Sequence, residues 1–291
     1  QETSDQIGVW IAGMGGLGKS TLAARLCTRV REQRPETKMA VLVGPLDEVA
    51  LLSKLSSQYA QFGEILARLN QPGVSLNGRL QNFFLAIEAA DQPLLLVLDD
   101  FEQNIPDAYV QNGSLRLTDT AYEILAALCT ALEQTASRSR LIVTCRYLQE
   151  DTLPPNRLHK ERLLPMGTAD VQKKTRRLIG DEAPPQVEAQ MQAQRILDIA
   201  DGNPRLLEWL VKLIQQTELV NEDLLRQLEA KQTEFRENIL AQTLLAALSS
   251  AERQAVARLS VVQLPVSPAL VTALALPVAA LDRAASLSLV E

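Results

Sequence analysis

Residues 13–20 read Gly13-Met14-Gly15-Gly16-Leu17-Gly18-Lys19-Ser20, which fits the pattern G-x-x-x-x-G-K-[ST] without a mismatch. Glycines in such a loop let the backbone curl, so that successive amide groups point inward at phosphate oxygens. An apolar run rich in β-branched residues, Ile7–Ala12, precedes the loop, and a helical pattern follows from Lys19 to about Arg31. Strand, glycine-rich loop and helix predict the opening unit of an α/β domain that binds a nucleotide.

The loop assigns roles to the residues in and after it. Lys19 is expected to reach the β- and γ-phosphates, the Ser20 hydroxyl to bind Mg²⁺, and Thr21 to assist at the α-phosphate. The positive end of the dipole of the following helix adds to the attraction for phosphate. The expected cofactors are therefore ATP or ADP with Mg²⁺. The backbone amides around the phosphates are expected from Gly15, Gly16, Leu17 and Gly18.

Apolar runs alternate with helical patterns up to about residue 165, which predicts one layered α/β domain. The runs are continuously apolar rather than alternating, so both faces of the strands are expected to be covered, as in a parallel sheet. The expected strands after the first are Met39–Val43, Leu94–Leu98 and Leu141–Thr144, with Leu163–Leu164 as a candidate to close the sheet. The expected helices are Glu48–Leu69, Leu76–Ala90 and Asp119–Thr135.

Strand patterns stop after Pro165, and the rest of the chain is expected to be helical. The stretch Leu259–Leu281 has no charged residue and is long enough to span a bilayer. It contains three prolines, however, which would break the hydrogen bonding that lipid demands, so we expect short buried helices there. The helical patterns are Ala169–Ile179, Val187–Ala200, Arg205–Gln216, Glu222–Leu240, Ser249–Leu259, Ala269–Ala275 and Val278–Leu287.

Acidic residues follow the apolar strand that ends at Leu98. Asp99 is the expected Mg²⁺-associated acid, acting through a metal-bound water, and Asp100 is the candidate general base or water-orienting group. Glu102 is a weaker alternative for the base. Arg146 stands at the end of another apolar strand. Because ligands bind beyond the carboxyl ends of parallel strands, this arginine is expected to face the γ-phosphate.

Composition excludes several other classes of protein. Lys and Arg number 29 against 35 for Asp and Glu, and the net charge of -6 disfavours a general electrostatic grip on DNA or RNA. A single histidine, His159, excludes zinc fingers, and its polar surroundings predict a solvated loop. The three cysteines form no disulfide framework and suit a reducing cytosol. With no signal peptide at its start, the chain is expected to be soluble and cytoplasmic.

Residues 13–23, GMGGLGKSTLA, resemble the NB-ARC (AP-ATPase) branch of the STAND signalling ATPases, which includes apoptosome organisers, plant resistance proteins and bacterial relatives. Residues 94–102, LLLVLDDFE, are similar to that family's second motif, whose second acid stands where Asp100 does and is compatible with hydrolysis. Residues 141–146, LIVTCR, are similar to its sensor strand, which implies that Arg146 contacts the γ-phosphate.

The resemblance continues into the helical half. Residues 201–207, DGNPRLL, look like the G-x-P motif of the family's helical lid, which implies that Pro204 packs against adenine. The implied organisation is a P-loop NTPase domain with a parallel sheet flanked by helices at 1–166, a helical lid at 167–242 and a partial winged helix at 243–291. Two family features have no match, namely a Gly-Arg-Glu segment before the first strand and a His motif late in the winged helix.

The resemblance implies a nucleotide-controlled switch within a larger multidomain signalling protein. ADP would hold a closed monomer, exchange for ATP would permit oligomerisation, and slow hydrolysis would reset the switch. The expected partners are the nucleotide and the sensor and effector domains of the parent chain. Both ends of the sequence are interpreted as cut, Gln1 just before the first strand and Glu291 where a wing hairpin should begin.

Two functions of other classes stay open. One is a conventional P-loop ATPase or kinase-type enzyme, although the helical half offers no recognisable site for an acceptor substrate. The other is a winged-helix transcriptional regulator, but the expected recognition helix, Ala269–Ala275, has no Lys or Arg to bind DNA phosphates. The sequence also lacks the Asn/Thr-Lys-x-Asp guanine motif, which favours ATP over GTP. Neither a membrane nor a nucleic acid is an expected direct partner.

Overall fold

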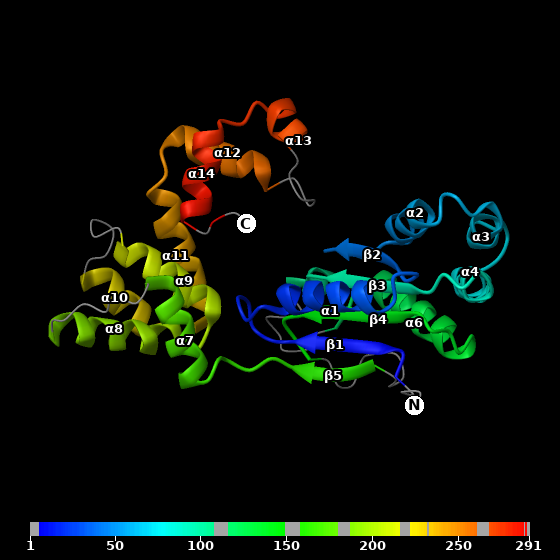
Figure 1. Cartoon of the computed structure of the whole chain (residues 1–291), viewed down its shortest axis with the longest axis horizontal. Coiled ribbons are helices and arrows are strands. Elements are labelled where there is room, and N and C mark those ends of the chain that lie inside the picture. The colour runs from blue at the N-terminus through cyan, green and yellow to red at the C-terminus, as the bar shows by residue number, and fades with distance from the viewer. Residues whose placement is uncertain are drawn as a thin grey trace. The chain divides into compact units, whose positions relative to one another are not determined.

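The computed structural model describes residues 6–107, 116–148, 158–179, 187–215, 222–231, 233–260, 268–287 and 289. Its contacts divide the chain into two compact units (Figure 1). The first unit holds Gln1–Met14 and Gly18–Leu163, and the second holds Gly15–Leu17 and Leu164–Glu291. All of the described strands belong to the first unit.

A parallel sheet of five strands forms the centre of the first unit. Because neighbouring strands are parallel throughout, their carboxyl ends lie at one edge of the sheet. The register places Ala12 beside Cys145 and Val43 beside Asp99. The predicted α/β class with a parallel sheet is confirmed. In the order β2-β3-β4-β1-β5, the strands are β1 (Gly8–Ala12), β2 (Lys38–Val43), β3 (Leu94–Asp99), β4 (Arg140–Cys145) and β5 (Leu158–Arg162).

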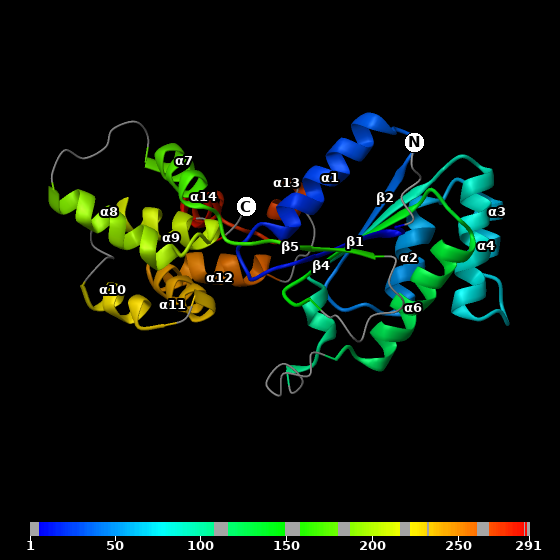
Figure 2. The same ribbon diagram turned by 90° about the horizontal axis from the view of Figure 1, so that it is seen from below.

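Helices cover both faces of the sheet, as the continuously apolar strands predicted (Figure 2). Helix α1 (Lys19–Gln33) packs on one face, where Leu22, Ala23 and Leu26 contact the apolar side chains of β1, β3 and β4. The other face carries the larger core, built around Trp10, Tyr59, Phe83, Phe84 and Phe101. The helices on that face are α2 (Glu48–Gln58), α3 (Gly63–Leu69), α4 (Leu76–Ala89) and α6 (Asp119–Gln134).

Short polar side chains begin several of these helices. Asp47 accepts a hydrogen bond from Ala50 N at the start of α2, and Ser75 and Thr118 cap α4 and α6 in the same way. The single helix predicted over 48–69 is wrong, since α2 and α3 are separate elements. The break falls at Tyr59, whose ring is fully buried and whose hydroxyl donates to Gln92 O at 2.9 Å.

The strand that closes the sheet also differs from the prediction. Leu163–Leu164 lies beyond it, because β5 ends at Arg162 and has the polar sequence Leu-His-Lys-Glu-Arg. A polar strand fits this position because β5 is at the edge of the sheet, where only Leu158 is buried. His159, predicted in a loop, lies in this strand and is exposed, with its Nε2 at 3.4 Å from Oε2 of Glu161.

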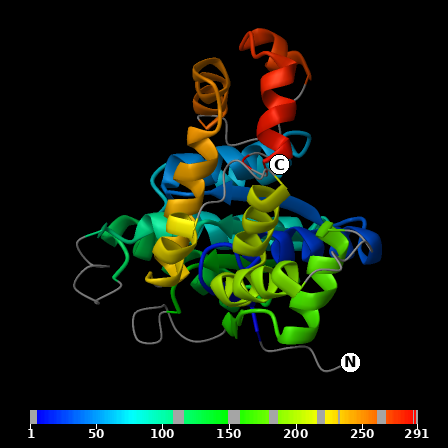
Figure 3. The same cartoon turned by 90° about the vertical axis from the view of Figure 1, so that its left-hand side faces the viewer.

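The second unit contains helices and no strand within the residues that the structure describes (Figure 3). Its main hydrophobic cluster joins α8, α9, α10 and α11 through residues such as Ile199, Leu207, Leu228 and Leu240. The single helix predicted over 222–240 is wrong, since two helices occupy this region. The helices are α7 (Thr168–Ile179), α8 (Val187–Ala200), α9 (Pro204–Gln215), α10 (Glu222–Glu229), α11 (Thr233–Ala246), α12 (Ser250–Leu259), α13 (Pro268–Ala273) and α14 (Val278–Ser286).

Residues 243–291 include α12, α13 and α14, which share a small cluster around Ala255, Leu276 and Ala280. Their assignment to a winged helix stays a prediction, as do the boundaries after 166 and 242. The uncharged stretch 259–281 forms short helices where it is described, but Val278 is 64% exposed, so the stretch is not buried throughout as predicted. Residues 261–267 of it lie outside the described residues. Of the helices that the structure describes, none combines the length and apolar character needed to cross a membrane.

Candidate nucleotide-binding site

The loop between β1 and α1 has the backbone geometry of an anion-binding loop. Gly16 and Gly18 have φ angles of +72° and +89°, a left-handed conformation that residues with a Cβ rarely adopt. A Cβ on Gly18 would meet no atom within 4 Å, so the backbone conformation and not crowding requires glycine there. Gly18 immediately precedes α1, whose first amides have no partner within the helix and carry the positive end of its dipole.

Lys19 folds back onto the loop that precedes it. Its Nζ donates hydrogen bonds to Gly13 O at 2.9 Å and to Met14 O at 3.1 Å. An ammonium group has three donors, so this arrangement supports the loop and leaves one donor for a phosphate oxygen. The residue is only 9% exposed, and its burial lowers the pKa of Lys19, a shift that the nearby Glu102 carboxylate opposes.

Ser20, Asp99 and Thr144 meet where α1 begins and where β3 and β4 end. The Ser20 hydroxyl donates to Oδ1 of Asp99 at 3.0 Å, and the Thr144 hydroxyl donates to the same oxygen. Mg²⁺ prefers hard oxygen ligands and usually keeps several waters. A serine hydroxyl hydrogen-bonded to a carboxylate is a donor set that fits this ion. Mg²⁺ bound there with a nucleotide would neutralise phosphate charge, with Ser20 as a ligand and Asp99 holding a bound water.

Asp100 continues from Asp99 in a left-handed conformation, with φ +56°. Aspartate adopts this region more readily than most residues, but it still costs energy that the surroundings must offset. The Asp100 N–H donates to the Thr144 hydroxyl at 3.1 Å, and the Asp100 carboxylate accepts a hydrogen bond from the Gln103 side-chain amide. Thr144 thus bonds to both acids at the end of β3. Its hydroxyl donates to the Asp99 carboxylate and accepts from the Asp100 N–H.

Glu102 and Arg146 form an ion pair at the same edge of the sheet. The Arg146 Nε donates to Oε1 of Glu102 at 2.9 Å, and its backbone N–H donates to Oε2 at 3.1 Å. The Glu102 side chain is 13% exposed and that of Arg146 50% exposed, so the pair presents mainly its cation to solvent. Burial raises the pKa of the Glu102 carboxyl, and the neighbouring Asp100 adds to the rise.

The carboxyl edge of the sheet therefore brings together most of the residues that the sequence singled out. Two residues of this edge were missed by the sequence analysis, Thr144 and Asn104. The sequence pattern predicts Thr144 only as part of an apolar strand, although its hydroxyl, two residues before Arg146, is a polar group at the expected carboxyl end of that strand. The short 3-10 helix η1 (Phe101–Asn104), which carries Asn104, was not predicted either. The residues that come together are Lys19, Ser20, Asp99, Asp100, Glu102 and Arg146.

Thr21 and Pro204 lie in different parts of the molecule. Thr21 is exposed on the first turn of α1. Pro204 is the first residue of α9, in the second unit. The preceding residue, Asn203, is 2% exposed, and its Oδ1 accepts hydrogen bonds from Arg205 N at 3.0 Å and Leu206 N at 3.2 Å. These bonds cap α9, so the Gly-Asn-Pro sequence has a local structural role whatever Pro204 contacts.

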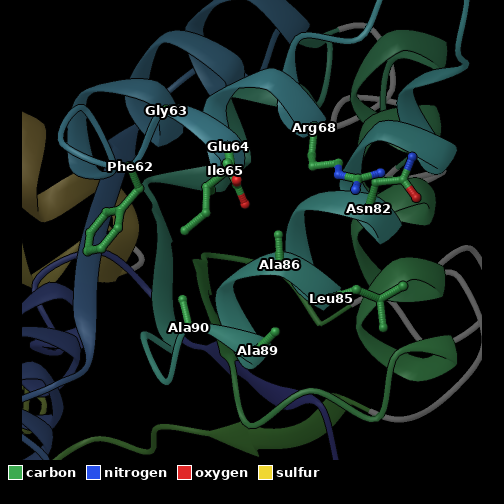
Figure 4. A pocket seen from close by; sticks show the side chains of 10 residues that line it. All are labelled: Phe62, Gly63, Glu64, Ile65, Arg68, Asn82, Leu85, Ala86, Ala89 and Ala90. Atoms are coloured by element: carbon green, nitrogen blue, oxygen red, sulfur yellow. The ribbon is translucent and has the colours of Figure 1, made fainter.

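A pocket of about 710 Å³ lies between α3 and α4, away from these motifs (Figure 4). Its wall combines small residues of α4, such as Ala86 and Ala89, with Ile65 and Arg68 of α3. The lining residues Ala89 and Ala90 are at the end of α4, a few residues before β3 begins at Leu94, so this part of the pocket is near the amino edge of the sheet. None of its lining residues belongs to the phosphate loop or to the acidic turn after β3.

Comparison with protein families gives one match. Residues 8–182 match the family model of the NACHT domain, which is more than half of the 291 residues. The match begins with β1 and runs past the end of the sheet, so it includes the phosphate loop, the acidic turn and Arg146. No protein of curated function matches the chain significantly.

Several solved structures are similar to the chain at low sequence identity. A Signal Transduction ATPase with Numerous Domains (STAND) protein with a tetratricopeptide repeat sensor from Pyrococcus horikoshii has a TM-score of 0.59 and 16% identity. The match covers 96% of this chain but only 36% of that one, so this chain spans about a third of its length. The ORC2 protein of Aeropyrum pernix follows with a TM-score of 0.42, 17% identity and coverage of 98% and 82%. Domain III of DnaA from Thermotoga maritima has a TM-score of 0.40, 14% identity and coverage of 82% and 85%.

Proposed function

Because the chain belongs to the NACHT family of P-loop NTPases, we propose that it is a nucleotide-controlled switch of a larger signalling protein. In this proposal it binds ADP in a resting state and ATP in an active state, each with Mg²⁺, and hydrolyses ATP slowly. The observation that carries the proposal is the ion pair between Glu102 and Arg146 at the edge of the sheet that also holds Lys19 and Ser20.

The ion pair supports the proposal because a γ-phosphate would compete with it. Arg146 is paired with the Glu102 carboxylate, and half of its side chain is exposed. ATP brings a third phosphate close to Lys19, whereas ADP leaves that position without an anion. A ligand can shift a conformational equilibrium only by its differential affinity for the two states. Transfer of Arg146 from Glu102 to the γ-phosphate supplies such a difference between ATP and ADP.

The arrangement of the acids supports slow hydrolysis. Asp100, the proposed general base, is hydrogen-bonded to Gln103, and Glu102, the alternative, is paired with Arg146. A base must come within hydrogen-bond reach of the attacking water, so each acid would first have to change partners. We therefore propose turnover well below the roughly 10 s⁻¹ that is typical of enzymes.

Finer parts of the proposal rest on the motifs. The sequence GMGGLGKSTLA resembles the NB-ARC branch of the STAND class, whereas the family model that matches is the NACHT domain, so we propose the STAND class without assigning the NB-ARC branch. Pro204 is proposed to contact adenine. ADP is proposed to favour a monomer and ATP an oligomer, with sensor and effector domains elsewhere in the parent chain. The cytosol is the proposed location.

The test is to measure ATP turnover and molecular mass for the same preparation. Light scattering after gel filtration would be compared between Mg·ADP and a Mg-bound non-hydrolysable ATP analogue. We expect a monomer with ADP, a larger species or a shifted equilibrium with the analogue, and slow turnover. Rapid turnover by a monomer, with the same mass in both nucleotides, would instead support a conventional ATPase.

A further inference from the structure

Asn104 is a buried polar side chain next to the acidic turn, and none of the motifs includes it. It is 3% exposed. Its Oδ1 accepts a hydrogen bond from Leu46 N at 2.7 Å, and its Nδ2 donates to Gly44 O and to Phe101 O, both at 3.1 Å. Buried polar groups are costly unless they are paired, and these three bonds satisfy both ends of the amide.

The three bonds join the loop that follows β2 to the turn that follows β3. Gly44 N donates to Asp99 O at 2.9 Å, so the loop is bonded to both ends of the turn. Gly44 has φ +85°, a left-handed conformation that favours glycine, and a Cβ on it would lie 2.8 Å from Oε1 of the Gln103 side chain. The Asn104 side chain is the part of this junction that contacts both segments.

The turn needs such support because its backbone is strained. Asp100 has a positive φ, and a non-glycine residue stays in that region only where neighbouring groups hold it there. Thr144 holds the turn from the side of β4, through the Asp100 N–H. Asn104 holds it from the side of β2, through Phe101 O. The attachment points are the Asp100 N–H and Phe101 O, and Glu102 directly follows Phe101, so the positions of both acids depend on these two bonds.

We propose that Asn104 is a positioning residue for ATP hydrolysis, which holds Asp100 and Glu102 in place by fixing the turn to the loop at Gly44 and Leu46. It touches neither nucleotide nor metal in this proposal. Phosphate binding depends on the loop before α1 and on Lys19, so loss of the Asn104 bonds lowers the rate of hydrolysis and leaves nucleotide affinity in place. The inference rests on the proposed ATPase function.

The experiment compares two variants of Asn104. Asn104→Ala removes all three hydrogen bonds. Asn104→Asp keeps the volume and the acceptor for Leu46 N but replaces the donor that binds Gly44 O and Phe101 O, so it serves if the alanine variant does not fold. In both variants we expect kcat for ATP to fall about tenfold or more, since small displacements of reacting groups have effects of this size. The affinity for Mg·ADP should change less than threefold.

Ser139→Ala is the matched control. Ser139 is 1% exposed, and its hydroxyl accepts a hydrogen bond from Leu94 N at 2.9 Å, at the other end of β3. The control therefore also removes a buried acceptor from a backbone amide, and it should lower the melting temperature without lowering kcat. A merely structural role for Asn104 would make the two positions behave alike.

Hydrogen exchange supplies a readout that does not depend on turnover. The Leu46 amide should exchange faster in Asn104→Ala and not in Ser139→Ala, while the Leu94 amide should show the reverse. Unchanged kcat in folded Asn104 variants, a parallel loss of ADP affinity, or unchanged exchange at Leu46 would overturn the inference. A wild-type protein that turns over no ATP would contradict the proposed function itself, and this is seen before any variant is made.

Discussion

Two glutamate–arginine pairs lie at opposite edges of the same sheet, and they differ in what surrounds them. At the amino edge, Glu88 accepts hydrogen bonds from Ser137 Oγ at 3.2 Å, from Arg138 N at 3.0 Å and from the Arg138 guanidinium. At the carboxyl edge, the carboxylate oxygens of Glu102 accept hydrogen bonds from one guanidinium nitrogen and from the backbone amide of Arg146.

The pKa values of the two glutamates move in opposite directions. Burial raises the pKa of Glu88, but the hydrogen bonds from Arg138 and Ser137 outweigh it, so the pKa is lowered. At Glu102 burial dominates and the pKa is raised. In the first pair, Ser137 and Arg138 supply several hydrogen bonds to Glu88, so we assign this pair a structural role. In the second pair the Glu102 carboxylate is buried without enough hydrogen bonds to lower its pKa, and this is the pair that we propose to rearrange when ATP binds.

The largest effect is expected from removing Lys19, the lysine that we propose binds phosphate. Lys19→Ala should abolish the stabilisation by ADP, which for a ligand at 100 times its Kd is about 2.7 kcal/mol. Lys38→Ala is the control, since Lys38 begins β2 at the amino edge. Thermal unfolding with and without Mg·ADP measures both. If Mg·ADP still raised the melting temperature of Lys19→Ala, the proposed nucleotide site at the carboxyl edge would be wrong.

The next effect concerns Asp100, the proposed general base. Asp100→Asn should lower the turnover of ATP on the order of 100-fold and spare ADP binding, because asparagine also tolerates a positive φ. Asp91→Asn is the control at the other edge, since Asp91 has φ +53° and its carboxylate accepts from Arg138 Nη2 at 2.7 Å. Single-turnover kinetics would measure the rates. Undiminished turnover in Asp100→Asn, with loss in Glu102→Gln, would assign the base to Glu102.

A smaller effect is expected from the arginines. Arg146→Ala should lower the affinity for an ATP analogue about tenfold relative to ADP, the size expected of one charged hydrogen bond to a phosphate. Arg138→Ala, in the pair with Glu88, should reduce stability without changing the preference between the nucleotides. Calorimetric titration of both variants with Mg·ADP and the analogue measures the ratio. Equal ratios in Arg146→Ala and the wild type would contradict the sensing role.

The smallest effect is on stability as a function of pH. The lowered pKa of Glu88 contributes stability that is present above its ordinary value of 4.5 and is lost as the pH falls through the lowered pKa. Glu88→Gln should therefore cost about 1–2 kcal/mol at neutral pH and less in acid. The raised pKa of Glu102 has the opposite effect on stability: its contribution to stability is lost as the pH rises through that pKa. The stability of Glu102→Gln relative to the wild type should therefore increase with rising pH. Urea unfolding at several pH values measures how the difference in free energy of unfolding between each variant and the wild type changes with pH. A change in the same direction for both variants would contradict the comparison.

The sequence predicts the regular parts of the carboxyl edge well and its side-chain pairing poorly. The phosphate loop and the buried strands follow from local patterns, because glycine spacing and continuous apolar runs have few other structural solutions. The polar edge strand β5 was missed because an exposed strand has no apolar run to indicate it. The roles of Thr144 and Asn104 depend on contacts between residues that are 44 to 60 positions apart in the sequence, and local sequence patterns do not indicate such contacts.

The most direct measurement for the central claim is the identity of the nucleotide that stays bound to the purified protein after extensive dialysis. Mass spectrometry of the released ligand would identify it, with Lys19→Ala purified in parallel. We predict ADP in stoichiometric amount with the wild type and none with the variant. A guanine nucleotide, or equal amounts of ADP with both proteins, would contradict it.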